Sequence, residues 1–143
     1  GVHMIKNGRV IITVQDADKE EALPIAQGLY ELGWTIYATA GTSDFFNDHD
    51  IPTIRTNKIG AGKPDILDHI TSGKINLVIN TPSKGVAHKR DGYKIRRNAV
   101  ECGIPCLTSL DTANAFLTCA KHVETTQLSV IDITKVSTFL NFI

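Results

Sequence analysis

Small polar side chains and lysines collect where the apolar runs of this sequence end. Five such ends carry residues 16–19, residues 39–43, Asn57 with Lys58, Asn80 with Thr81, and Thr108 with Ser109. Lysine supplies positive charge, and Thr, Ser and Asn side chains donate hydrogen bonds. Carboxylates are few among these residues, so the set suits a phosphate group. The residue types therefore predict a phosphate-binding site.

The segment Thr39-Ala40-Gly41-Thr42 contributes most to this prediction. Taken alone, it is an ordinary strand-to-helix turn, in which Gly41 takes a positive φ and Thr42 caps the next helix. Lys19 and Lys58 alone are likewise typical of solvated surface lysines. The convergence of several strand ends on one edge favours phosphate, together with the free N–H groups of a helix that begins after Gly41.

The elements that position these side chains alternate between strand and helix. β-branched runs predict strands at residues 9–14, 34–39, 52–56, 75–80 and 104–108. Helical spacing predicts helices at residues 19–32, 44–49, 65–72, 93–101 and 112–122, with a polar loop at 82–92. Residues 128–133 are expected to add a strand or an extended tail, and the apolar residues 139–143 to dock on the domain. This order predicts an α/β fold with a parallel sheet between two layers of helices.

The sequence indicates one domain at residues 5–143, without repeats or linkers. Gly1-Val2-His3-Met4 reads as a remnant of a cloning vector before the natural chain. The 143 residues carry 15 basic and 15 acidic side chains, so no global field favours nucleic acid or a membrane surface. No apolar run is long enough to span a bilayer, and no secretory signal is visible. We therefore expect a cytoplasmic protein that contacts neither nucleic acid nor membrane.

Two further patterns favour structural roles. Cys102, Cys106 and Cys119 lack the spacing of a zinc site and are expected to be buried thiols in a reducing compartment. Gly60-Ala61-Gly62-Lys63-Pro64 lacks the Gly-Lys-Ser/Thr ending of a Walker loop, and is expected to be a connector before a helix that Pro64 begins. No metal site is predicted.

The chain resembles the methylglyoxal-synthase-like domain at the C-terminus of carbamoyl phosphate synthetase large subunits. The resemblance covers roughly residues 7–123. The matching stretches are Asp18-Lys19-Glu20, Ala38-Thr39-Ala40-Gly41-Thr42, Thr56-Asn57-Lys58-Ile59-Gly60, Ile79-Asn80-Thr81, Ile95-Arg96-Arg97 and Ile104-Pro105-Cys106-Leu107-Thr108-Ser109-Leu110-Asp111-Thr112.

This resemblance implies a five-stranded parallel sheet and an allosteric role for a nucleotide monophosphate such as UMP or IMP. The implied phosphate contacts are Lys19, Thr39, Thr42, Lys58, Asn80 and Thr81. Ile95 and Ser109 are implied to lie near the base and ribose, and Thr108 to face an ornithine pocket shared with a neighbouring domain. Two departures affect the pyrimidine end: Pro82 follows Thr81 where relatives often carry a second hydroxyl residue, and the loop at 84–92 is slightly longer.

The implied parent enzyme is an ATP-dependent ligase that uses Mg or Mn and pairs with a glutaminase small subunit, in arginine or pyrimidine biosynthesis. No catalytic residue or cofactor is expected within this domain itself. The implied partners are the effector, the rest of the large subunit and the small subunit.

Two alternatives remain at this point. The fold also resembles methylglyoxal synthase, which releases phosphate from dihydroxyacetone phosphate and needs a carboxylate base and a histidine. Asp65, Asp91 and His88 are the candidates for those roles, although a solvated histidine is the usual explanation for His88 in a polar loop. An interaction module without a ligand is the other alternative, with Arg96, Arg97 or the apolar C-terminus as contact surface.

Overall fold

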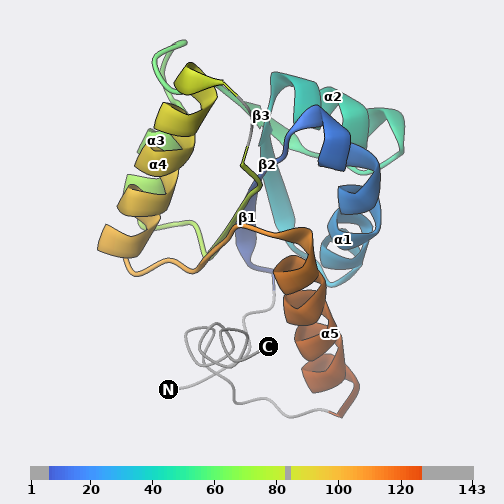
Figure 1. Ribbon diagram of the computed structural model, residues 1–143. Coiled ribbons are helices and arrows are strands. Elements are labelled where there is room, and N and C mark those ends of the chain that lie inside the picture. The colour runs from blue at the N-terminus through green and yellow to red at the C-terminus, as the bar shows by residue number, and fades with distance from the viewer. Residues whose placement is uncertain (1–6, 83–84, 127–143) are drawn as a thin grey trace.

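A computed structural model describes residues 7–82 and 85–126. It shows strands and helices in alternation, wound around one sheet (Figure 1). The strands are β1 (Arg9–Thr13), β2 (Thr35–Thr39), β3 (Ile54–Thr56), β4 (Leu77–Asn80) and β5 (Cys106–Leu107). All five predicted strands are present, each shorter than the apolar run that predicted it.

The sheet is parallel throughout, with the order β3-β2-β1-β4-β5. The chain moves outward from β1 to β3 and then returns to place β4 on the other side of β1. The strand order therefore reverses between β1 and β4. In open α/β sheets a crevice forms at such a reversal, beyond the carboxyl ends of the strands.

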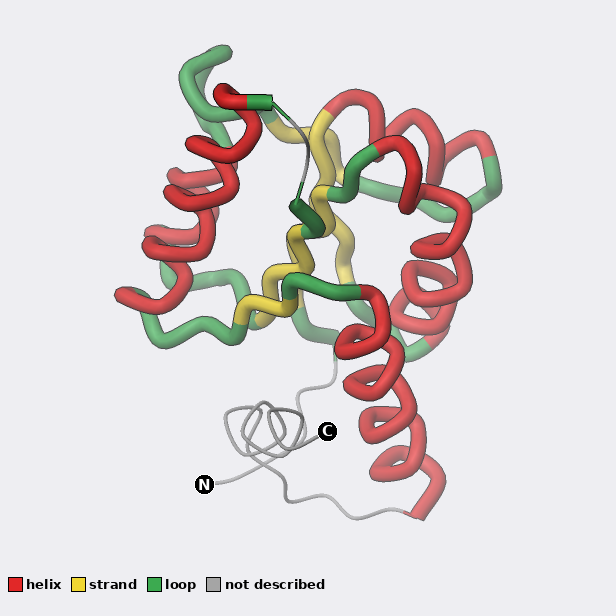
Figure 2. The backbone as a smooth tube through the Cα atoms, in the orientation of Figure 1, coloured by secondary structure: helices red, strands yellow, loops and turns green. Residues whose placement is uncertain are grey.

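Helices cover both faces of the sheet, as the sequence predicts. Figure 2 shows α3 and α4 on one face and α1, α2 and α5 on the other. The alternating side chains of β1 serve both layers: Val10 and Ile12 pack with Leu29 and Phe116, whereas Ile11 packs with Ile70. This two-sided burial explains why the strand reads as a continuous apolar run.

The helices are α1 (Lys19–Glu31), α2 (Ala40–Asp48), α3 (Ile66–Thr71), α4 (Val86–Glu101) and α5 (Leu110–Thr126). A short 3-10 turn, η1 (Asp16–Asp18), leads into α1. Helix α3 begins with a capping box, in which the Asp65 carboxylate accepts from the Asp68 N–H and the Asp68 carboxylate accepts from the Asp65 N–H. Pro64 therefore precedes the cap and does not begin the helix, contrary to the sequence-based expectation.

Helices α2, α4 and α5 begin four, seven and two residues before their predicted starts, and the first two differences concern predicted site residues. Helix α2 begins at Ala40, so Gly41 and Thr42 lie in its first turn. Gly41 is helical and has no positive φ, and Thr39, not Thr42, occupies the N-cap. Helix α4 begins at Val86, after Gly85 with a φ of 107°, so much of the expected loop at 82–92 is helical.

The prediction for the three cysteines is partly wrong. Cys102 is exposed just after α4, whereas Cys106 and Cys119 are half-buried, and all three thiols are free. Burial raises the pKa of the Cys106 thiol to about 11. That thiol is therefore protonated at neutral pH.

Some predictions lie outside the described residues. These are the vector remnant at 1–4, the strand at 128–133 and the docking of 139–143. Within the described ranges, no helix is both long and apolar enough to cross a membrane.

Candidate functional site

A cavity of about 810 Å³ opens at the carboxyl ends of the strands. Its position agrees with the crevice expected where the strand order reverses. All five strand ends or the segments that follow them contribute to its wall, and α4 closes one side. The lining residues are Thr13, Val14, Gln15, Asp16, Lys19, Thr39, Gly41, Thr42, Lys58, Ile59, Ile66, Asn80, Thr81, Pro82, Lys89, Asp91, Gly92, Ile95, Arg96 and Thr108.

The N-terminus of α2 forms one end of this cavity. Thr39 holds the N-cap with an extended backbone, and its side chain makes no capping hydrogen bond. The first N–H groups of the helix therefore lack a side-chain acceptor from the cap. A methyl group on Gly41 would lie 3.8 Å from the Nζ atom of Lys19, so an ammonium group stands at this helix end. Positive charge and free N–H groups together favour an anion here.

The hydroxyl side chains at this end are held by the fold. Thr42 is 3% exposed in the first turn of α2, and Thr39 is 7% exposed at the end of β2. Both line the cavity, as does the exposed Lys58 beyond β3. Three successive elements thus bring two hydroxyls and an ammonium group to one place.

Lys19 pairs with Asp16, which precedes it by three residues. The Lys19 ammonium donates a hydrogen bond to an oxygen of the Asp16 carboxylate. This bond lowers the pKa of Asp16 below its ordinary value, and the charge of Lys58 acts in the same direction. The Asp16 side chain is almost fully exposed, whereas that of Lys19 is mostly buried. Asp16 therefore competes with any anion for Lys19 from the solvent side.

Asn80 and Thr81 tie β4 to β1 at the centre of the site. The Thr13 hydroxyl donates to Oδ1 of Asn80 at 2.7 Å, and the Gln15 N–H donates to the Thr81 hydroxyl at 3.1 Å. The Thr81 N–H also donates to the Thr13 carbonyl at 3.1 Å. Nδ2 of Asn80 is buried and has no hydrogen-bond partner among the described residues.

Most of the predicted site residues meet in this cavity. The structure brings together Lys19, Thr39, Thr42, Lys58, Asn80, Thr81, Ile95 and Thr108. Ser109 is not among the lining residues. Its hydroxyl contacts the Thr112 hydroxyl at 2.6 Å and accepts from the Thr112 N–H at 3.2 Å, at the start of α5.

Of helix α4, sequence reasoning placed Ile95 in the effector site and missed Lys89, Gly92 and Arg96. These three residues line the cavity at successive spacings of three and four residues, which places them on one helix face. The same spacing can be read in the sequence. It did not reveal a helix, because the residues at this spacing are polar or glycine and residues 82–92 were predicted to form a loop. With these residues the wall holds four cationic side chains and two carboxylates.

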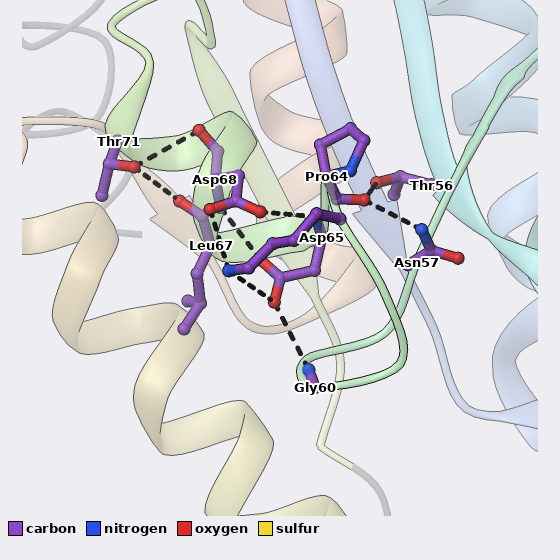
Figure 3. A network of polar contacts seen from close by, with 9 residues as sticks. Thr56, Asn57, Gly60, Pro64, Asp65, Leu67, Asp68 and Thr71 are labelled. Carbon is purple, nitrogen blue, oxygen red and sulfur yellow. Dashed lines mark hydrogen bonds and ion pairs between the residues drawn. The ribbon is translucent and has the colours of Figure 1, made fainter.

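The residues considered for acid–base chemistry are differently placed. Asp65 is 3% exposed and absent from the cavity wall. Figure 3 shows its carboxylate within the capping network, where it accepts hydrogen bonds from the N–H groups of Asp68 and Gly60. Asp91 lines the cavity, and the side chain of His88 lies outside the described part of the structure.

No metal centre is visible in the described part of the chain. Within residues 7–82 and 85–126, no group of three or more His, Cys, Asp or Glu side chains could hold a metal ion.

Comparison with known proteins identifies a family and a relative. A family model described as an MGS-like domain matches residues 21–108. The carbamoyl phosphate synthase large chain of Lachnoclostridium phytofermentans is 41% identical over 136 residues, which are 95% of this chain and 13% of that protein. The chain therefore spans only a small part of the length of that relative.

Two solved structures share the fold. Methylglyoxal synthase from Elizabethkingia anophelis NUHP1 superposes with a TM-score of 0.65 at 18% identity, covering 78% of each chain. ForH superposes with a TM-score of 0.61 at 21% identity, covering 84% of this chain and 81% of that one. The five-stranded parallel sheet and the match over residues 21–108 show that this chain belongs to the MGS-like domain family.

Proposed function

We propose that this chain is a regulatory domain of a carbamoyl phosphate synthase large chain and that it binds an anionic effector through a phosphate group. The identity of 41% over 95% of the chain supports this parent protein. A nucleoside monophosphate such as UMP or IMP is the proposed effector.

The observation that carries this proposal is the placement of Lys19 at the N-terminus of α2. A phosphate there would meet the N–H groups of the first helical turn, the Lys19 ammonium and the hydroxyls of Thr39 and Thr42. Lys58 supplies a second positive charge at the same end of the cavity. Charge-assisted hydrogen bonds of this kind are about twice as strong as neutral ones.

The proposal extends to the remainder of the parent protein. The ATP, Mg or Mn, bicarbonate and ammonia chemistry of such a synthase belongs to parts of the large chain outside this sequence, and the glutaminase small subunit is a further proposed partner. The domain would then act in the cytoplasm on arginine or pyrimidine synthesis, and Thr108 would face the ornithine pocket at a domain junction. An effector regulates only if it binds two states of the parent differently.

Calorimetric titration of the chain with inorganic phosphate, UMP and IMP tests the proposal. We expect saturable binding of phosphate and tighter binding of a nucleotide, because the cavity extends well beyond the phosphate end. The proposal fails if none of the three ligands binds to the folded chain.

The alternative of a methylglyoxal synthase is less well supported by the geometry. Asp65 is committed to capping α3 and does not line the cavity, so Asp91 is the one remaining carboxylate candidate of the two. We therefore predict no release of phosphate from dihydroxyacetone phosphate, measured with a coupled phosphate assay. Turnover that an Asp91→Asn variant abolishes would reverse this ranking.

A further inference from the structure

The loop at residues 57–64 brings Lys58 to the phosphate end of the cavity. Lys58 lines the cavity, and its charge acts on the carboxylate of Asp16. The residue is exposed and forms no salt bridge with any side chain in the ranges 7–82 and 85–126. The position of its ammonium group therefore depends on the backbone of the loop.

Two sets of hydrogen bonds hold that backbone, and the first closes the neck of the loop. The Ile66 N–H donates to the carbonyl of Asn57 at 3.1 Å, and residues 57 and 65 pair as in a parallel sheet. Nδ2 of Asn57 donates to the carbonyl of Pro64 at 3.1 Å. Asn57 directly precedes Lys58, so these bonds fix the backbone on one side of the lysine.

The second set holds the turn that begins at Lys58. The Ala61 N–H donates to the carbonyl of Lys58 at 3.0 Å, and Gly60 has a φ of 80°. A positive φ at the third residue is typical of a type II turn, in which glycine is favoured at this position. The Gly60 N–H donates to Oδ2 of Asp65 at 3.3 Å (Figure 3). The turn is therefore tied to the Asp65 carboxylate.

Asp65 serves two elements with one carboxylate. Oδ2 holds the turn, whereas Oδ1 accepts from the Asp68 N–H at 3.0 Å and caps α3. Asp65 is 3% exposed, and the exposed Lys63 ammonium lies 3.8 Å from Oδ2. A helix cap needs only one side-chain oxygen, because serine and asparagine cap as well as aspartate does. Capping of α3 therefore does not account for the contact between Oδ2 and Gly60.

We propose that Asp65 is a positioning residue for the phosphate site, because it holds the turn at 58–61 and so places Lys58 for the ligand. This inference rests on the proposed function. Asp65 does not line the cavity, so it acts through Lys58 and not on the phosphate itself. A turn that is already held lowers the ordering cost that a mobile lysine would add to binding.

Asp65→Asn tests this role at nearly constant size. The asparagine oxygen can still cap α3, but its NH₂ group cannot accept a hydrogen bond from Gly60. Calorimetry should show inorganic phosphate binding about three- to tenfold more weakly, which is the ordering cost of one loop or side chain. Asp65→Asn combined with Lys58→Ala should bind phosphate within about twofold of Lys58→Ala alone, since no lysine is left to position.

A readout in the free chain separates positioning from a general loss of structure. The Gly60 amide should lose its protection from hydrogen exchange in Asp65→Asn and keep it in Asp68→Ala. Asp68→Ala is the matched control, because it removes the other half of the capping box and leaves the Gly60 contact in place. Its thermal midpoint should fall, while its phosphate affinity should stay within about twofold of the unmodified chain. Asp65→Ser also keeps a cap, is too short to reach Gly60, and replaces Asp65→Asn if that variant does not fold.

The outcomes distinguish this inference from the proposed function. Unchanged phosphate affinity in Asp65→Asn, or equal weakening in Asp68→Ala, would overturn the positioning role while phosphate still binds to the unmodified chain. A further loss of affinity when Asp65→Asn is added to Lys58→Ala would also overturn it. If the unmodified chain binds no phosphate, the proposed function fails instead, and the Gly60 amide still reports whether Asp65 holds the turn.

Discussion

The proposed phosphate end of the cavity depends on a few side chains whose positions the backbone fixes. Thr42 projects from the first turn of α2 and is almost fully buried, whereas Lys58 reaches the cavity from an exposed position after β3. The two residues supply different interactions, a neutral hydroxyl donor and a positive charge. Their removal should therefore have separable effects.

Lys58→Ala and Thr42→Val should each weaken phosphate binding. A charge-assisted contact is worth roughly 1.5–3 kcal/mol, so the dissociation constant should rise about tenfold to a hundredfold for the lysine variant. The loss of a neutral hydroxyl should cost less, about 0.5–1.5 kcal/mol. Calorimetric titration with phosphate measures both changes.

Lys63→Ala is the matched control for this pair. Lys63 lies in the same loop as Lys58, but its ammonium pairs with Asp68 at 3.2 Å and does not line the cavity. Phosphate affinity should be unchanged in this variant. Unaltered binding in both Lys58→Ala and Thr42→Val would show that the phosphate site is misplaced.

Asp16 should act as an internal competitor for Lys19. Its carboxylate accepts a hydrogen bond from the ammonium group that the ligand needs, and it is almost fully exposed. Asp16→Asn should therefore tighten phosphate binding, by about two- to fivefold as expected for an exposed pair. Weaker binding in this variant, measured by the same titration, would place Asp16 in a supporting role instead.

At the scale of elements, the position of each helix N-terminus determines which side chains line the cavity. Helix α3 begins with the Asp65–Asp68 capping box, which holds the Asp65 carboxylate away from the cavity (Figure 3). The Asp65 N–H donates to the Asp68 carboxylate at 2.8 Å and, with a smaller contribution from Lys63, lowers the pKa of Asp68 below its ordinary value of 3.8. The box thus makes stability depend on pH.

The sign of that dependence follows from the direction of the shift. Because the pKa of Asp68 is lower in the folded chain, its stabilising effect is complete above pH 3.8 and is lost as the pH falls through the folded value. Asp68→Asn should therefore lose less thermal stability on acidification than the unmodified chain does. Asp48→Asn, at the exposed end of α2, is the control and should leave the acid loss unchanged. An identical acid loss in Asp68→Asn and the unmodified chain would contradict the assignment.

The sequence predicted the strands well and the helix starts less well. β-branched runs such as Val10–Ile12 are buried on both faces of the sheet. A strand buried on both faces forms a continuous apolar run, which can be recognised in a sequence. Gly41 lies in the first turn of α2 and Gly92 in the second turn of α4, and both line a polar cavity, so no apolar period marks these helix starts. Helix propensity and periodicity both fail where a helix end lines a polar cavity.

The candidate site has a part that the sequence predicted, at the strand ends, and a part that it missed, on α4. Residues at strand ends, such as Lys19 and Asn80, could be predicted because parallel strands bring their carboxyl ends to one edge. Arg96 could not be assigned to the cavity while the preceding segment was read as a loop. The orphaned Nδ2 of Asn80 depends on a hydrogen bond from Thr13, 67 residues away, which no local pattern reports.

At the scale of the whole molecule, a neutral protein concentrates its positive charge in one place. The chain carries 15 basic and 15 acidic side chains, yet the cavity wall holds four cations and two carboxylates. The sheet makes this possible, because its strand order reverses between β1 and β4 and directs five segments to one crevice (Figure 1). The family fold supplies the crevice, and the residues lining it determine what binds.

The central claim is that a phosphate ligand binds at the N-terminus of α2, within the cavity at the strand ends. A titration of the ¹⁵N-labelled chain with UMP, followed by amide chemical shifts, tests both the binding and its place. We predict saturable shifts that are largest for the amides of Gly41, Thr42 and Ser43, with further shifts at Lys58 and Asn80. No saturable shift, or the largest shifts on the outer face of α4 around Tyr93 and Arg97, would contradict the account.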